Sequence, residues 1–138
     1  MLNRLRILWV DDECDTAKFA SRTDILAIDG IVADLVRGPD EAWSYLREHP
    51  LPDCVVVDIM MPPGERYSLI DTAYGALTGI RFIEELRSAE VRLPVIVVTV
   101  RAVHELEGIE HLEPIAYLTK PVLTSEIAAA IRAIVNTD

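Results

Sequence analysis

Near its centre the chain carries the stretch Cys54-Val55-Val56-Val57-Asp58-Ile59-Met60-Met61-Pro62, in which β-branched apolar residues end in a carboxylate and a turn-forming proline. Apolar residues without alternation are typical of a strand that is covered on both faces, as in a parallel sheet. Ligands of such sheets bind beyond the carboxyl ends of the strands. The stretch therefore predicts a buried strand that delivers Asp58 to a binding edge.

Three other apolar runs end in reactive side chains in the same way. They are Leu5–Val10 before Asp11 and Asp12, Pro94–Val98 before Thr99, and Ile115–Thr119 before Lys120. Because ligand sites form where parallel strands end, we expect three carboxylates, a hydroxyl and an ammonium around one crevice. Clustered carboxylates repel one another unless a cation lies between them, and a site with only oxygen ligands favours a hard cation such as Mg2+.

These four motifs, in this order along the chain, resemble the receiver domain of two-component response regulators. The resemblance covers essentially the whole sequence, and it implies a single domain over residues 1–138. The implied fold class is α/β: a flavodoxin-like, doubly wound, five-stranded parallel sheet in the strand order 2-1-3-4-5, with helices on both faces.

The resemblance also implies where the chemistry takes place. Asp58 is the expected phosphoacceptor, because an aspartate can attack phosphorus and form an aspartyl phosphate when the incoming charge is neutralised. Asp11 and Asp12, together with Asp58 and the backbone carbonyl of Met60, are the expected ligands of Mg2+. The alternative for each carboxylate alone is a helix-capping role, which does not explain why all of them end strands at one edge.

Two further strand-end residues complete the expected site. Lys120 is expected to bind a phosphoryl oxygen as a point charge, and the Thr99 hydroxyl to donate to another. Tyr117 stands where receivers commonly carry an aromatic switch that moves together with the threonine when the site is phosphorylated. The alternation of side chains along the strand also allows Tyr117 to be an ordinary half-buried packing residue.

The sequence departs from the receiver pattern after Asp58. A usual receiver reaches a glycine within a handful of residues, whereas here residues 63–78 come before Gly79 and form an atypical insertion. Its apolar residues fall at helical spacing and predict a helical turn or an N-terminal extension of the next helix; they are Leu69, Ile70, Ala73, Tyr74 and Leu77. Long loops in compact domains are commonly functional, so a lid or a docking role is one hypothesis and a harmless surface insertion is the other.

Val100 is the second departure, because receivers usually have a small residue directly after the threonine. A β-branched side chain is stiff and could narrow access to Asp58. The insertion and Val100 together favour a rival hypothesis, a receiver-like interaction module that works without phosphorylation.

The helices expected between the strands follow from periodicity and capping signals. The first runs from Glu13 to about Ala27, with Ala17, Ala20 and Phe19 on its apolar side. The second runs from Gly38 or Pro39 to about His49, and the third from Ile80 to about Ser88. A short helix is expected between Thr99 and Pro114 with Val103, Leu106 and Ile109 inward, and the last runs from a cap at Thr124 or Ser125 to about Val135.

Composition narrows the classes of function. The net charge of −10 over 138 residues argues against a nucleic-acid-binding surface, which requires Lys and Arg. No apolar run reaches the roughly 20 residues of a membrane span. Cys14 and Cys54 lack the spacing of a disulfide framework or a zinc site, and nothing near His49 completes a metal site. We therefore expect a cytoplasmic protein with no membrane association.

The expected function is to take a phosphoryl group from the phosphohistidine of a sensor histidine kinase or a phosphotransfer protein and to signal to an unknown downstream protein target. Such a chain is not a classical enzyme, because it catalyses only its own phosphorylation and slow dephosphorylation. A true phosphohydrolase is a distant alternative, since no second carboxylate follows Asp58 at Met60 to activate water.

Overall fold

The computed structural model describes residues 4–100 and 112–136. The strands are β1 (Leu5–Val10), β2 (Ile31–Val36), β3 (Cys54–Val57), β4 (Val95–Thr99) and β5 (Ile115–Thr119). The helices within the described ranges are α1 (Ala17–Ile28), α2 (Pro39–Glu48), α3 (Thr78–Ser88) and α4 (Thr124–Val135).

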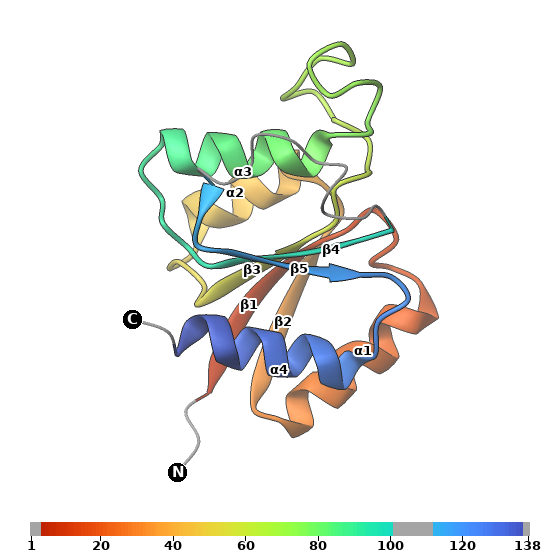
Figure 1. The fold of residues 1–138 in the computed structure, drawn as a ribbon, viewed down its shortest axis with the longest axis vertical. Helices are drawn as coiled ribbons and strands as arrows, with labels where there is room; N and C mark the ends of the chain where they lie inside the picture. The colour runs from red at the N-terminus through yellow and green to blue at the C-terminus, as the bar shows by residue number, and fades with distance from the viewer. Residues whose placement is uncertain (1–3, 101–111, 137–138) are drawn as a thin grey trace.

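The strands form one parallel sheet in the order β2-β1-β3-β4-β5. Helices α2 and α3 cover one face, and α1 and α4 cover the other (Figure 1). The predicted doubly wound α/β fold and its strand order are therefore confirmed. All the strands end at the same edge, which is where the reactive side chains were expected to meet.

The alternation of side chains along β3 explains why this strand reads as a continuous apolar run. Val55 and Val57 belong to the core under α2 and α3, whereas Cys54 and Val56 belong to the core under α1 and α4. All four are fully buried. Burial of a valine-sized side chain is worth about 1.5–3 kcal/mol, so this strand stabilises both halves of the fold at once.

Helix α1 begins later than the sequence predicted, at Ala17 instead of Glu13. The Asp11 carboxylate accepts the Glu13 N–H at 2.9 Å and so stabilises a turn at the point where the helix was expected. Phe19 is buried, but Ala17 and Ala20 are exposed, so the predicted apolar side of this helix was wrong except for Phe19.

Between β3 and α3 lies a run of turns, residues 63–77, which we call the β3–α3 segment. It contains no α-helix, and α3 begins at Thr78, two residues before the predicted Ile80. Ala73, Tyr74 and Gly75 all adopt positive φ angles, of 51°, 59° and 93°, a backbone conformation that interrupts a right-handed helix. Of the predicted apolar positions, Leu77 packs against the core, while Leu69, Ile70, Ala73 and Tyr74 are exposed.

Helix α4 also starts differently from the prediction. Leu123 is its N-cap residue, and Thr124 and Ser125 already lie within the first turn of the helix. A Thr or Ser hydroxyl was expected to cap the helix. Instead, the Glu126 carboxylate accepts the Leu123 N–H at 3.0 Å and stabilises the first turn. The remaining predicted helix, with Val103, Leu106 and Ile109, lies outside the described residues.

The other sequence predictions concern isolated polar side chains. Cys14 and Cys54 are both free and buried. Burial raises the pKa of the Cys54 thiol to about 12, so this group packs as an apolar one. His49 follows α2, stacks on Tyr45 at 4.3 Å, and its Nδ1 lies 3.1 Å from the Tyr45 carbonyl, as expected of an ordinary helix-end histidine. In the described ranges, every helix is too short or too polar to cross a bilayer.

Candidate functional site

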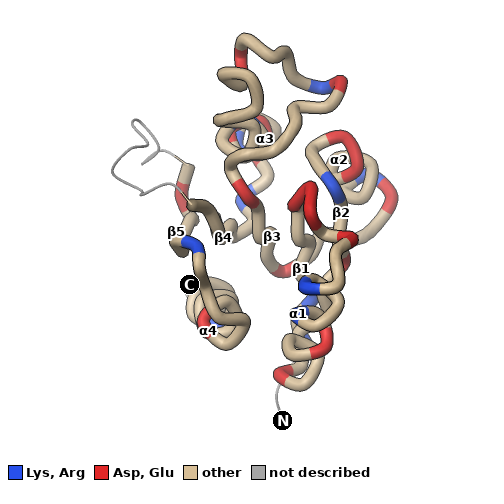
Figure 2. Tube along the Cα trace, turned by 90° about the vertical axis from the view of Figure 1, so that its right-hand side faces the viewer, with Lys and Arg blue, Asp and Glu red and all other residues tan. Residues whose placement is uncertain are grey.

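The backbone of the sheet brings the strand ends together. The Asp58 N–H donates to the Val10 carbonyl at 3.2 Å, so the residue that ends β3 lies against the end of β1. On the other side, the Lys120 N–H donates to the Thr99 carbonyl at 2.8 Å and joins the ends of β4 and β5. Figure 2 views this edge, where acidic stretches follow β1 and β3 and a basic stretch follows β5.

The side chains of Asp58 and Lys120 form the central contact. Lys120 Nζ lies 2.7 Å from Asp58 Oδ2 and 3.8 Å from Asp11 Oδ2. The other Asp58 oxygen, Oδ1, accepts the Met60 N–H at 3.3 Å. The Asp58 side chain is only 11% exposed and the Lys120 side chain is 29% exposed, so the ion pair is largely shielded from solvent.

The carboxylates oppose one another electrostatically. Burial raises the pKa of Asp11, and the charges of Asp58 and Asp12 add to that rise, while the Glu13 N–H and Lys120 oppose it. Burial also raises the pKa of Asp12, and the nearby Asp58 charge contributes. Burial alone would lower the pKa of Lys120, but the hydrogen bond and charge of Asp58 outweigh it and raise the pKa. The crevice therefore concentrates negative charge and favours a cation.

Thr99 and Tyr117 lie on the β4 and β5 side of the crevice. Thr99 is 2% exposed and stands opposite Thr119 in the sheet. Tyr117 stands opposite Val97 and is partly buried against the core beneath α2 and α3. Val100, directly after Thr99, is 64% exposed, so its side chain is not part of the core.

The donor set suits a hard cation, since Asp11, Asp12 and Asp58 offer only oxygen atoms. Their present positions, however, do not form a preassembled cluster: among the residues that the structure describes, no three His, Cys, Asp or Glu side chains are placed to hold a metal ion together. Asp12 is exposed, and Lys120 occupies the position beside Asp58.

The β3–α3 segment is fixed to α2 at its beginning. The Asp40 carboxylate, in the first turn of α2, accepts the N–H groups of Glu65 at 2.8 Å and Arg66 at 3.1 Å. Gly64 approaches this carboxylate so closely that a Cβ on it would lie 2.4 Å from Asp40 Oδ2, and its φ is +69°. Only glycine fits this approach.

The segment is also fixed to α3, through Glu85. Arg66 Nε lies 2.8 Å from Glu85 Oε1, and the Tyr67 hydroxyl donates to the same carboxylate oxygen. The Arg66 guanidinium lies over the Trp43 ring, 4.7 Å from its centre, and Trp43 Nε1 donates to the Tyr67 hydroxyl at 3.4 Å. Sequence reasoning did not find these contacts, because partners far apart in sequence leave no local spacing signal.

The segment returns to the phosphoacceptor strand at the start of α3. The Gly79 N–H donates to the Ile59 carbonyl at 2.9 Å, and the Thr78 hydroxyl donates to the Met61 carbonyl at 2.6 Å. The segment is therefore held to α2, to α3 and to the residues after Asp58, and none of these contacts places it over the crevice as a lid.

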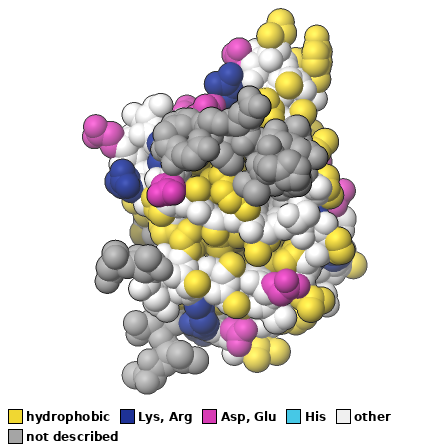
Figure 3. Space-filling model, in the orientation of Figure 1, with side chains coloured by type: hydrophobic (Ala, Val, Ile, Leu, Met, Phe, Trp, Pro, Cys, Tyr) yellow, Lys and Arg dark blue, Asp and Glu magenta, His cyan; other side chains and the backbone are white. Residues whose placement is uncertain are grey.

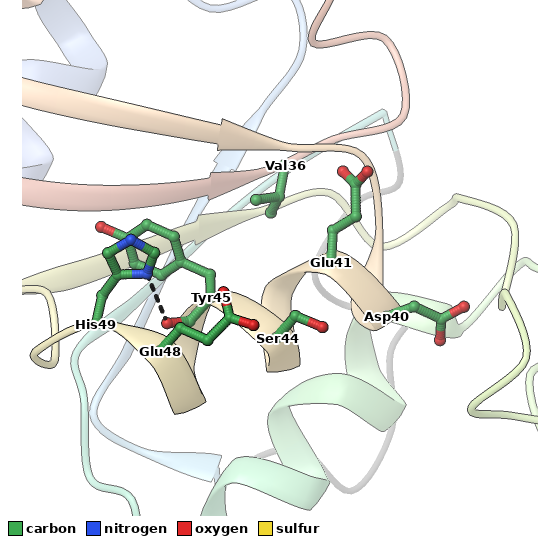
Figure 4. Close-up of a pocket in the computed structure, with 7 residues that line it drawn as sticks. All are labelled: Val36, Asp40, Glu41, Ser44, Tyr45, Glu48 and His49. Carbon is green, nitrogen blue, oxygen red and sulfur yellow. Dashed lines mark hydrogen bonds between the residues drawn. The ribbon is translucent and has the colours of Figure 1, made fainter.

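Two surface hollows lie beside these contacts. One, of about 280 Å³, runs from Asp12 to the base of the segment at Pro62 and Gly64, with Asp40 and Glu41 in its wall. The other, of about 350 Å³, follows α2 from Val36 to His49 (Figure 4). None of the predicted site residues lines the second hollow, whereas the first begins at Asp12.

Sequence comparison relates the chain to known signalling proteins. A family model described as the response regulator receiver domain matches residues 7–132. Response regulator RppA of Synechocystis is 31% identical over 137 residues, which cover 94% of this chain and 50% of that protein. The chain spans about half the length of the curated relatives it matches.

Structural comparison gives the same fold. The receiver domain of a Francisella response regulator matches with a TM-score of 0.72 at 23% identity, covering 96% of this chain and 97% of that one. The response regulator protein TrrA of Thermotoga maritima, solved in complex with Mg2+-BeF, matches with a TM-score of 0.70 at 20% identity, covering 94% and 98% of the two chains.

Proposed function

Because this chain belongs to the response regulator receiver domain family of two-component signalling, we propose that it accepts a phosphoryl group on Asp58 from a phosphohistidine donor. Phosphoacceptance is the standard role of this family, whose members are regulatory proteins rather than classical enzymes. The observation that carries the proposal is the 2.7 Å contact between Lys120 Nζ and Asp58 Oδ2 at the carboxyl edge of the sheet.

This contact fits a nucleophile that is held in a fixed orientation. A phosphoryl group brings negative charge to a crevice that already holds the carboxylates of Asp11, Asp12 and Asp58. Lys120 would exchange part of its contact with Asp58 for a phosphoryl oxygen, and the Thr99 hydroxyl would donate to another. In our proposal Thr99 and Tyr117 then act as the switch that alters the surface around β5.

Mg2+ is the cofactor that these donors fit, and members of the family bind it at the phosphorylation site. Asp11, Asp12, Asp58 and the Met60 carbonyl would hold it. When bound, it would supply positive charge against the carboxylate and the phosphoryl oxygens. Autophosphorylation from small donors and slow self-dephosphorylation belong to the same proposal.

The proposal extends to organisation and partners. We propose one receiver domain over residues 1–138, in which residues 63–78 are an insertion relative to other receivers. The domain would work in the cytoplasm, its donor would be a sensor histidine kinase or a phosphotransfer protein, and its output would be binding to a downstream protein. With a net charge of −10, this domain is not proposed to bind nucleic acid or membrane itself.

The test is intact mass spectrometry after incubation with Mg2+ and acetyl phosphate. We expect a gain of one phosphoryl group that requires Mg2+ and disappears in Asp58→Asn. Asp24→Asn is the matched control, since Asp24 is an exposed aspartate on α1, away from the strand ends. That control should be labelled as the wild type is.

Equal labelling of Asp58→Asn would exclude Asp58 as the acceptor. Binding of Mg2+ without labelling by acetyl phosphate or by any phosphorylated kinase would favour the rival function, an interaction module that works without phosphorylation. The observation favouring that rival is the exposed apolar surface of the β3–α3 segment.

A further inference from the structure

The β3–α3 segment exposes apolar side chains that its own fold does not use. Leu69 is 55% exposed, Ile70 80% and Tyr74 79%. Figure 3 shows hydrophobic atoms on the part of the molecule that protrudes beyond α3, where Figure 1 places the segment. We call these three residues the apolar tip. Grouped apolar side chains on a protruding surface are typical of protein-binding sites, and aromatic residues are common among their strongest contacts.

The tip is held in place rather than free to fold back. Its base is fixed by Asp40 on α2, by Glu85 on α3, and by the Gly79 contact to Ile59. Tyr74 itself has a φ of 59°, in the left-handed region that non-glycine residues rarely adopt. The Tyr74 N–H donates to the Leu69 carbonyl at 2.6 Å, which fixes this turn while the aromatic ring stays in solvent.

The charge around the tip is negative. Arg66 and Arg81 are the basic residues of this region, and they pair with Glu85 and Glu84 respectively. The carboxylates of Glu65 and Asp71 make no ion pair within residues 4–100 and 112–136. A complementary partner therefore has an apolar face with Lys or Arg at its rim.

The hollow between Asp12 and the base of the segment carries the same sign of charge. It runs from Asp12 to Gly64, and Asp40 and Glu41 lie in its wall. Its basic residue, Arg37, is within 3.7 Å of Asp15. A basic rim that suits the tip thus also suits the acidic surface that reaches Asp12.

We propose that the apolar tip docks the protein that donates the phosphoryl group. This inference rests on the proposed function and names the partner of the same site. The segment leaves the sheet just after Asp58 and returns at Gly79, so its tip is fixed relative to the phosphoacceptor. A protein that brings phosphohistidine to Asp58 must cover this edge of the sheet, whereas acetyl phosphate is too small to reach from Asp58 to the tip.

The experiment compares how fast two phosphodonors label the wild type, a variant of the tip and a control variant. The tip variant is Ile70→Ser with Tyr74→Asn, because asparagine tolerates the positive φ at position 74. Leu51→Ser is the matched control: Leu51 is also exposed, at 56%, but precedes β3 and so lies at the opposite edge of the sheet. The probes are acetyl phosphate and a purified sensor kinase, autophosphorylated with radiolabelled ATP, that transfers label to the wild-type chain.

We expect the tip variant to lose at least tenfold in the rate of transfer from the kinase while its labelling by acetyl phosphate stays within twofold of wild type. Asp71→Lys should slow transfer from the kinase several-fold at low salt and less at high salt, because the charge contact is screened. Leu51→Ser should change neither rate.

Unchanged transfer from the kinase to the tip variant would overturn the inference and leave the tip to a downstream partner or a second copy of the chain. Equal losses with both donors would also overturn it, because they would show damage to the site itself. If neither donor labels wild-type Asp58, the proposed function fails, and the inference fails with it.

Discussion

Asp58 and Lys120 show how one ion pair balances a crowded site. The crevice contains the carboxylates of Asp11, Asp12 and Asp58, and Lys120 is the cation within 4 Å of two of them. Burial raises the pKa values of Asp11 and Asp12, so both carboxylates are held in a less favourable environment than water. Such opposition is typical of functional sites, where charge is arranged for a ligand rather than for stability.

Val100 allows a specific prediction about the rate at which a phosphodonor labels Asp58. If passage of a phosphodonor forces this stiff side chain off its rotamer at a cost of about 0.5–1 kcal/mol, Val100→Ala should label about two- to fivefold faster. The measurement is the initial rate of Mg2+-dependent labelling by acetyl phosphate. An unchanged rate would show that the exposed Val100 side chain does not limit access to Asp58.

Among the elements, α3 depends on a close approach at its first turn. A Cβ at Gly79 would lie 2.3 Å from the Asp58 carbonyl oxygen and 2.7 Å from Ile59 Cα, both of them backbone atoms. The start of α3 therefore lies directly against the phosphoacceptor loop, and the packing of this helix and the position of Asp58 are coupled.

Gly79→Ala tests that coupling. Helix propensity alone predicts a gain of about 0.5–1 kcal/mol, but overpacking against backbone typically costs about 1–3 kcal/mol, so we expect a net loss in the free energy of unfolding. Urea denaturation measures it. Gly38→Ala is the control, because its nearest neighbour to a new Cβ is 4.0 Å away. A Gly79→Ala protein as stable as Gly38→Ala would contradict the close approach.

The contact of the β3–α3 segment with α3 should depend on pH through Glu85. The hydrogen bond from Arg66 is the main cause that lowers the pKa of Glu85 below its ordinary value of 4.5, and Tyr67 adds to it. A group whose folded pKa is lowered stabilises the fold above its unfolded pKa, and this stabilisation is lost as the pH falls through the folded pKa.

Glu85→Gln should therefore be less stable than wild type at neutral pH, and the difference should shrink as the pH falls below about 4.5. Because this ion pair is about one-third exposed, we expect the difference at neutral pH to be small, about 1 kcal/mol or less. Thermal unfolding of both proteins across this pH range measures it. A constant difference at all pH values would contradict the role of the charge.

On the scale of the whole molecule, a net charge of −10 opposes the compact state by self-repulsion. Any salt should relieve part of this repulsion by screening. A bound Mg2+ should add a specific term, about 1.4 kcal/mol when the free ion is tenfold above its Kd.

We expect MgCl2 to raise the Tm more than NaCl at equal ionic strength. Asp12→Asn should remove the excess and keep the response to NaCl, since it deletes one proposed ligand and leaves most of the surface charge. Equal responses of the wild type to the two salts would show that the carboxylates hold no specific Mg2+.

The apolar runs alone predicted the parallel sheet and the residues at its carboxyl edge. Val55, Val56 and Val57 lie on a strand that is buried on both faces. Their continuous apolar run therefore predicted a central strand without information on the neighbouring strands. The order of the strands followed from the receiver resemblance, and the structure confirms it. The meeting of Asp11, Asp58 and Lys120 was expected because parallel strands end at one edge, and Lys120 Nζ does lie within 4 Å of both carboxylates.

The contacts that hold the β3–α3 segment and the first residues of α1 and α4 could be found only from the folded chain. The helical spacing of Leu69, Ile70 and Tyr74 predicted a helical turn, and the Thr72 N–H does donate to the Ser68 carbonyl at 3.2 Å. Positive φ angles from Ala73 to Gly75 then turn the chain, so those apolar side chains stay in solvent instead of forming a buried face. The segment is fixed instead by Asp40 and Glu85, which lie far from it in sequence. Periodicity records which side chains share a face within one element, whereas contacts between elements depend on distances that only the folded chain sets.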